Sequence, residues 1–211
     1  MDTLAALHAV DYRAVGLEGF GKPQGYLERQ LRRMSELWEM ARFRNIPDID
    51  EVRRWLVDNL PPQSGSTIVH GDYKLDNAII SRTLPARILA VVDWEMSTLG
   101  DPLADLGWLL YFWRDAEEPG LDLPVTTVTD REGFLTRTQL RVRYEEMTGR
   151  PTGDTRWYMA LAGWKIAIIM EGAYRRYLAG VADHPAYSVL EQEVPALAHR
   201  ALQALKGELG P

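Results

Sequence analysis

The sequence predicts an α+β fold that is mainly helical, and three observations support this class. Apolar residues recur at helical spacing in long segments near both ends of the chain. Between them lie short runs rich in β-branched residues, "STIVH", "NAIIS" and "RILAVVDW", which are typical of strands. The 211 residues are 46% hydrophobic and 26% charged, a globular composition with enough apolar residues for a sizeable core.

Two helices are predicted before the strands, within residues 1–62. In Gly25–Arg44 the apolar residues fall on one helical face, at Leu27, Leu31, Met34, Trp38 and Ala41. A second helix is expected over Asp50–Leu60, because Asp48 or Asp50 can cap its first turn and a Pro-Pro pair follows its end.

The remaining helices are predicted after the strands, which occupy residues 66–100. They span Asp101–Trp113, Asp130–Thr148, Asp154–Leu178 and, approximately, Tyr187–Lys206. Asp101 is a suitable N-cap because Pro102 takes the first helical position. A Pro-rich surface loop is expected over 114–129. We interpret the chain as one domain, with 101–211 as its helical subdomain.

Charge and cysteine content exclude several classes of function. A net charge of −6 argues against nucleic acid or an anionic membrane as the main partner. No cysteine is present, which excludes disulfides, thiolate catalysis and cysteine-bound metals. The N-terminus lacks the features of a signal peptide. The most apolar run, Trp157–Met170, contains Lys165 and is shorter than the roughly 20 residues that span a bilayer. A cytoplasmic location is expected.

A dense group of polar residues stands in "IVHGDYKLDN", Ile68–Asn77, directly after a predicted strand. Asp93 follows the later strand, so two strands beside one loop could bring it next to Asn77. An amide oxygen and a carboxylate suit Mg²⁺. Asp72 would lie across the loop, able to accept a proton from a hydroxyl group, and Lys74 adds a positive charge near a phosphoryl group. This set predicts phosphoryl transfer.

A carboxylate metal hydrolase that uses His70, Asp72 and Asp93 is a weaker alternative. The chain has three other histidines, His8, His184 and His199, and all lie far from His70 in the sequence. His70 itself is more often a structural residue at such a strand end.

The segments "HGDYKLDN" and "VVDWE" resemble the catalytic loop and metal-binding Asp of the protein-kinase-like superfamily. They are most similar to the aminoglycoside phosphotransferase (APH) and choline kinase branch, which has His-Gly-Asp. "DWEMSTLGDPLADLG" and "GLEGFGKPQGYLERQ" extend the resemblance to the APH-like kinases related to acyl-CoA dehydrogenase-fused domains. The resemblance covers essentially the whole chain and implies a helical C-terminal lobe that uses ATP and Mg²⁺ to phosphorylate a small-molecule hydroxyl.

The resemblance also implies a role for each residue of the site. Asp72 corresponds to the catalytic base, Lys74 to a phosphate contact, and Asn77 and Asp93 to the Mg²⁺ ligands. The remaining positions are supporting ones: Ile79 and Val92 beneath the adenine of ATP, and His70, Asp101 and Asp105 as structural supports.

Kinases of this type carry an N-terminal β lobe with a glycine-rich loop and a strand Lys. Nothing before Asp72 matches either, and "GLEGFGKP" (Gly16–Pro23) is a poor P-loop because Pro replaces the required Ser or Thr. We therefore expect a C-terminal lobe alone, and a non-catalytic binding module is the alternative. The opening "DTLAALHAVDY" resembles the helix that follows the hinge between the lobes in these kinases. A lobe alone would expose apolar residues of this first helix, including Leu4, Leu7 and Val10, and favour a homodimer or a missing N-lobe partner.

The acceptor is expected against the late helices, near Glu171, Arg175 and Arg176. Glu171 and Arg175 are one turn apart, so the simpler interpretation is that they pair with each other. The late helices contain no dense acidic cluster, which a cationic aminoglycoside would usually require.

Overall fold

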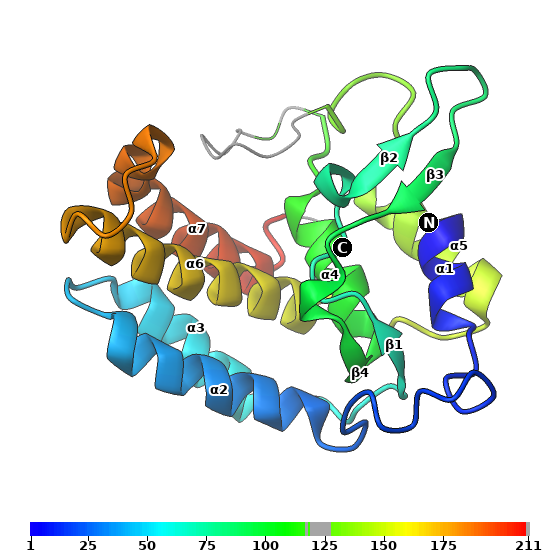
Figure 1. Ribbon diagram of the computed structural model, residues 1–211, viewed down its shortest axis with the longest axis horizontal. Coiled ribbons are helices and arrows are strands. Elements are labelled where there is room, and N and C mark those ends of the chain that lie inside the picture. Colours follow the sequence, from blue (N-terminus) through cyan, green and yellow to red (C-terminus); the bar gives the residue numbers. More distant parts are fainter. Residues whose placement is uncertain (117, 119–127, 210–211) are drawn as a thin grey trace.

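The computed structural model describes residues 1–116, 118 and 128–209 (Figure 1). The described helices are α1 Asp2–His8, α2 Tyr26–Ala41, α3 Pro47–Asp58, α4 Pro102–Phe112, α5 Arg137–Thr148, α6 Arg156–Leu178 and α7 Leu190–Lys206. The strands are β1 Thr67–Val69, β2 Ala78–Ile80, β3 Ile88–Val91 and β4 Thr98–Gly100. A mainly helical chain with small sheets is the fold class that the sequence predicts.

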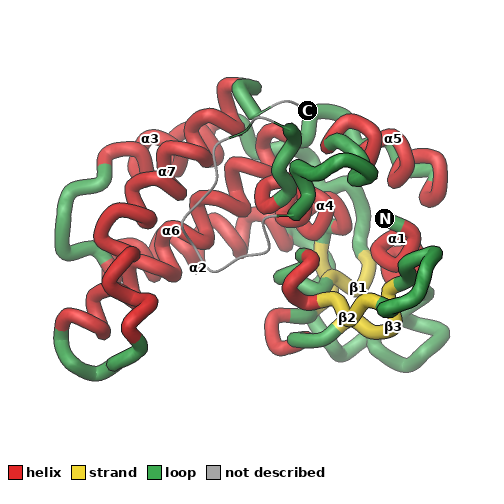
Figure 2. Tube along the Cα trace, turned by 90° about the horizontal axis from the view of Figure 1, so that it is seen from above, coloured by secondary structure: helices red, strands yellow, loops and turns green. Residues whose placement is uncertain are grey.

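Helices α2, α3, α6 and α7 form a layered helical body, and the strands gather at one end of it (Figures 1 and 2). α6 packs against α2, α3, α4 and α7, which explains why apolar residues lie on several of its faces. Two buried tryptophans of α6 donate indole hydrogen bonds to α3 carbonyls: Trp157 to Leu56 at 3.0 Å and Trp164 to Ile49 at 3.1 Å. The buried indole N–H groups are thus satisfied while their rings fill the core.

The strands form two separate antiparallel pairs. β1 pairs with β4, with Thr67 opposite Gly100. β2 pairs with β3, with Ala78 opposite Val91 and a register shift between Ile79 and Ile80. The sequence did not predict β4, a strand of three residues whose partner lies about 30 positions upstream.

Several predicted helix boundaries are wrong. α3 begins at Pro47 with Ile46 as N-cap, so neither Asp48 nor Asp50 caps it. α5 begins at Arg137 rather than Asp130, because Thr136 and Gln139 form a reciprocal capping box there. Of the loop expected over 114–129, residues 117 and 119–127 lie outside the described part of the chain.

The first helix is less exposed than predicted. Leu4 is fully buried and Leu7 half-buried, because α1 packs against α5 and β1; Val10 alone of the three is exposed. The expectation of an apolar patch at Leu4 is therefore wrong. Among the described helices, none is long and apolar enough to cross a membrane.

Candidate active site

The segment His70–Asn77, which we name the polar loop, connects β1 to β2. Gly71 has a φ of 86°, and a Cβ atom there would lie 2.7 Å from the carbonyl oxygen of Met96. Only glycine fits this backbone and this close approach. The loop thereby turns Asp72 out of the strand while staying packed against the segment that follows Asp93.

Three N–H donors fix the carboxylate of Asp72. Lys74 Nζ lies 2.6 Å from Oδ1 and 2.7 Å from Oδ2. Asn77 Nδ2 donates to Oδ2 at 2.8 Å, and Trp108 Nε1 of α4 donates to Oδ1 at 2.7 Å. The Asp72 and Lys74 side chains are 14% and 18% exposed, so the pair is at the surface of the core and still reachable. Charged hydrogen bonds of this kind hold the oxygens in a defined direction.

Asn77 and Asp93 lie on adjacent segments. Val92 N donates to the backbone oxygen of Asn77 at 2.9 Å, so Asp93 begins one residue beyond that contact. Asn77 Nδ2 is used by Asp72, which leaves Oδ1 as the free acceptor. Asp93 is exposed, has a left-handed backbone with φ 66°, and forms no hydrogen bond or ion pair with any described residue. The Asn77 Oδ1 and the Asp93 carboxylate are hard oxygen donors that fit Mg²⁺, although the described residues contain no cluster of three acidic or histidine ligands.

His70 connects the polar loop to the strand before Asp93. Its Nδ1 accepts from Asp72 N at 3.2 Å, so the proton is on Nε2, which donates to Val92 O at 2.9 Å. The ring is fully buried and lies 4.7 Å from the Trp94 ring, centre to centre. Both ring nitrogens are therefore in use, and neither is free for the metal that the hydrolase alternative requires.

Asp101 and Asp105 are buried behind the polar loop and accept hydrogen bonds from it or its surroundings. Asp105 accepts from His70 N at 2.6 Å and Gly71 N at 2.8 Å, and also contacts His8 Nε2 at 3.3 Å. Asp101 caps α4 through Leu103 N at 2.9 Å, as predicted, and receives the Tyr158 hydroxyl at 3.1 Å. Burial and the adjacent Asp101 raise the pKa of Tyr158, which keeps it a donor. We name His8, His70, Asp101 and Asp105 the bracing residues.

Ile79 and Val92, the positions expected beneath adenine, are 51% and 39% exposed. They lie on β2 and directly after β3, beside Asn77 and Asp93. We name Ile79, Val92 and Asp93 the front edge of the site. It presents two apolar side chains and one carboxylate to solvent.

The sequence interpretation missed two residues of the site, Trp108 and Lys165. Trp108 donates to Asp72, and Lys165 Nζ lies over the Trp108 ring, 5.2 Å from its centre. Lys165 was noted only as an interruption of an apolar run. A lysine inside an otherwise apolar helix is itself a signal, because burying an ammonium group is costly without a function or a partner.

The pairing expected between Glu171 and Arg175 is wrong. Glu171 is fully buried and receives the Arg44 guanidinium, with Nη2 2.8 Å from Oε2. Arg175 instead donates to the carbonyl oxygen of Met40. A buried carboxylate needs a partner, and Arg44, which follows α2, reaches it while also binding the backbone at Leu190 and Glu191.

Comparisons with known proteins identify relatives of this chain. Acyl-CoA dehydrogenase family member 11 of Gallus gallus is 35% identical over 98% of this chain, which spans 27% of that protein. Acyl-CoA dehydrogenase family member 10 of Mus musculus is 35% identical over 85% of this chain, and the match covers 17% of that protein. The chain thus spans about a quarter or less of the length of these relatives.

A crystal structure of a Ralstonia eutropha JMP134 protein, provisionally named an aminoglycoside phosphotransferase, has a TM-score of 0.85 and 35% identity. It matches 97% of this chain and 63% of its own. The model of the phosphotransferase enzyme family, APH, matches residues 1–134, which include the polar loop, Asp93 and α4. The chain belongs to the phosphotransferase enzyme family.

Proposed function

We propose that this chain is the catalytic lobe of an ATP-dependent kinase that phosphorylates a hydroxyl group of a small molecule. One observation carries the proposal. The Asp72 carboxylate is fixed by Lys74, Asn77 and Trp108, the segment that bears Asp93 runs next to Asn77, and no described residue bonds the Asn77 Oδ1 or the Asp93 carboxylate. A fixed base next to hard oxygen donors is the arrangement that phosphoryl transfer to an alcohol requires.

In the proposed reaction Asp72 accepts the proton of the acceptor hydroxyl. The oxygen forms a bond to the γ-phosphorus of ATP, while the bond from that phosphorus to the β–γ bridging oxygen breaks. ADP leaves with the electron pair, and the acceptor becomes a phosphate monoester. The Lys74 ammonium group has three N–H donors and uses two of them on Asp72, so the third can contact the transferring phosphoryl group.

Asn77 and Asp93 are the residues that would hold Mg²⁺. When bound, the ion neutralises charge on the phosphate oxygens of ATP. His70 keeps the two ligand-bearing segments together through its bonds to Asp72 N and Val92 O. Ile79 and Val92 supply apolar surface for the adenine ring.

A non-catalytic binding module is the second candidate, and the engagement of both Asp72 oxygens by Lys74 favours it. Under this proposal the lobe binds its ligand and Asp72 remains paired. The two candidates differ in whether a phosphate ester forms.

Phosphorus NMR of the reaction mixture distinguishes them. The protein, with any coding sequence in frame before Met1, is mixed with MgATP and panels of neutral, anionic and cationic alcohols. We expect ADP and one new phosphomonoester signal, both dependent on an alcohol. Inorganic phosphate without an ester would indicate a hydrolase, and unchanged ATP in every mixture would leave the binding module as the better account.

A further inference from the structure

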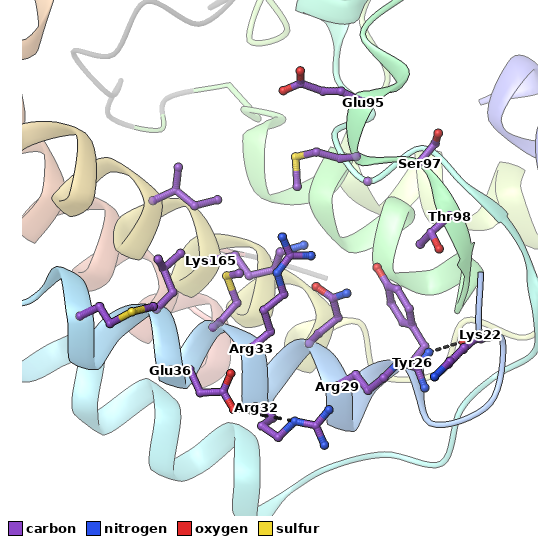
Figure 3. A pocket seen from close by; sticks show the side chains of 17 residues that line it. Lys22, Tyr26, Arg29, Arg32, Arg33, Glu36, Glu95, Ser97, Thr98 and Lys165 are labelled. Carbon is purple, nitrogen blue, oxygen red and sulfur yellow. Dashed lines mark hydrogen bonds and ion pairs between the residues drawn. The ribbon is translucent and has the colours of Figure 1, made fainter. Parts of the chain in front are cut away.

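A large basic pocket opens next to the polar loop, between α2, α6 and the segment 95–98 (Figure 3). Its volume is about 870 Å³, and Gly71, the neighbour of Asp72, forms part of its wall. Five cationic side chains of the described residues line it: Lys22, Arg29, Arg32, Arg33 and Lys165. Two acidic side chains, Glu36 and Glu95, oppose them. Such a surplus of positive charge is unexpected in a chain with a net charge of −6.

Among the cationic side chains that line the pocket, Lys165 is buried. It is 6% exposed, and no described residue forms a hydrogen bond or ion pair with its Nζ. The Trp108 ring forms a cation–π contact with the ammonium group, and this contact replaces a counter-ion only in part. Burial lowers the pKa of Lys165 to about 8; the charges of Asp105 and Asp72 oppose this shift, and that of Arg33 adds to it. The ammonium group therefore lies in a place where an added anion would supply the missing partner.

Arg33 of α2 lies across the pocket from Lys165, and Arg29, which donates to the carbonyl oxygens of Lys22 and Gln24, lies at the rim. Arg29 and Arg33 are spaced at i and i+4, so they share one side of the helix. Figure 3 shows Arg33 projecting from α2 toward Lys165 of α6, whereas Arg32 lies on the other side of α2, beside Glu36. Arg33 forms no hydrogen bond or ion pair with any described residue, and the exposed Arg32–Glu36 pair at 3.9 Å is weak.

If the pocket were only a solvent-exposed helix face, the presence of the arginines would be explained, but the burial of Lys165 would not. Solvated cations need no partner, whereas a buried ammonium group without one destabilises the fold. Two helices distant in sequence therefore present unpaired cations to the same volume. That coincidence indicates a ligand.

We propose that this pocket binds the acceptor and that the acceptor carries an anionic group, phosphate or carboxylate, held between Arg33 and Lys165. This inference rests on the proposed function and names its substrate class. With the anion held there, the far end of the acceptor lies at Gly71, where its hydroxyl can reach Asp72. Arg29, Arg32 and Lys22 at the rim attract the anion, and neutral or cationic alcohols gain nothing from the pocket.

Calorimetry without nucleotide or divalent metal tests the pocket separately from the reaction. The probes are inorganic pyrophosphate, citrate, glycerol and the cationic aminoglycoside kanamycin. We expect one molecule of pyrophosphate or citrate to bind per chain, more weakly at high salt, and no binding of glycerol or kanamycin. The stronger of the two anions identifies phosphate or carboxylate as the group recognised.

Arg33→Gln and Lys165→Met should each weaken anion binding about tenfold, since each removes a charged partner. Arg54→Gln is the matched control: it removes the same charge from an exposed site on α3, outside the pocket, and should bind as the natural protein does. Arg33 is exposed, so its variant tests the pocket even if Lys165→Met alters folding.

Equal binding by the natural protein and Arg33→Gln, binding of kanamycin in preference to the anions, or no anion binding at all would overturn the inference. Anion binding that depends on Arg33 and Lys165, without any phosphate ester in the NMR assay, would leave the pocket standing and refute the kinase proposal instead.

Discussion

The two sides of the polar loop differ in how far their polar groups are satisfied. Behind it, Asp105 alone accepts two backbone N–H groups and contacts His8, and Asp101 accepts from α4 and Tyr158. In front of it, Asp93 has no partner among the described residues, and Ile79 and Val92 face solvent. The bracing residues therefore hold the backbone, while the front edge keeps its groups available. Substitution of a bracing residue should therefore change mainly stability, whereas substitution on the front edge should change mainly activity.

The largest effect is expected at Asp72, between the two sides. Asp72→Asn should lower turnover by about 10²–10⁴-fold, because an amide cannot accept the hydroxyl proton. Affinity for MgATP should stay nearly unchanged, whereas Asp93→Asn should lower both turnover and MgATP affinity. Steady-state rates and nucleotide calorimetry on both variants test this split. Near-normal turnover of Asp72→Asn would show that Asp72 is not the base.

Substitution of a bracing residue should lower the stability of the fold. Asp105→Ala leaves the buried N–H groups of His70 and Gly71 without an acceptor, and we expect a loss of about 3 kcal/mol in the free energy of unfolding. Asp93→Asn is the comparison on the front edge, and it should change stability by less than about 0.5 kcal/mol, since Asn also tolerates a positive φ. Urea denaturation measures both. Equal losses would remove the distinction between the two sides.

Lys165 is the exception behind the loop, because it is buried and no described residue forms a hydrogen bond or ion pair with it. Its folded-state pKa of about 8 lies below the ordinary lysine pKa of 10.5, so the unfolded chain holds more protons between those pH values. Stability should therefore rise with pH across this window, and the full cost of the buried charge is present below it.

Lys165→Met should consequently be more stable than the natural protein at pH 7, by up to about 3 kcal/mol. The difference should shrink toward pH 10, where the native lysine is also neutral in the folded state. Asp105, Arg33 and Asp72, the charged groups that act on Lys165, are present in both proteins. Urea denaturation at pH 7, 8, 9 and 10 tests this, and parallel stability curves for the two proteins would contradict it.

Local patterns in the sequence were enough for the helical class, for the strands on either side of the polar loop, and for the Asp101 cap. The site residues predicted in the polar loop, Asp72, Lys74 and Asn77, are close in sequence, so a single turn brings them together. Features that depend on distant partners were not predictable in this way. β4 requires β1, Glu171 requires Arg44, and the burial of Leu4 requires α5.

The basic pocket was missed for the same reason. Arg33 belongs to a helix with an ordinary amphipathic pattern, and Lys165 belongs to an apolar run 132 positions away along the numbering. Neither segment signals a ligand by itself. The shared volume appears only when α2 packs against α6, and that packing is decided by apolar side chains rather than by the cations.

The smallest effect concerns Trp108, which connects the two sides by donating from buried α4 to Asp72. Trp108→Phe keeps an aromatic ring beneath Lys165 and removes one hydrogen bond to a carboxylate. Because one such bond contributes about 1.5 kcal/mol, turnover should fall about tenfold, with KM for MgATP unchanged. Trp38→Phe is the matched control, since Trp38 donates to Asp50 at 2.9 Å between α2 and α3. Both variants should lose similar stability in urea, but only Trp108→Phe should lose turnover. A parallel loss of turnover in Trp38→Phe would show that the effect comes from weakened packing, and Trp108 would then have no part in positioning Asp72.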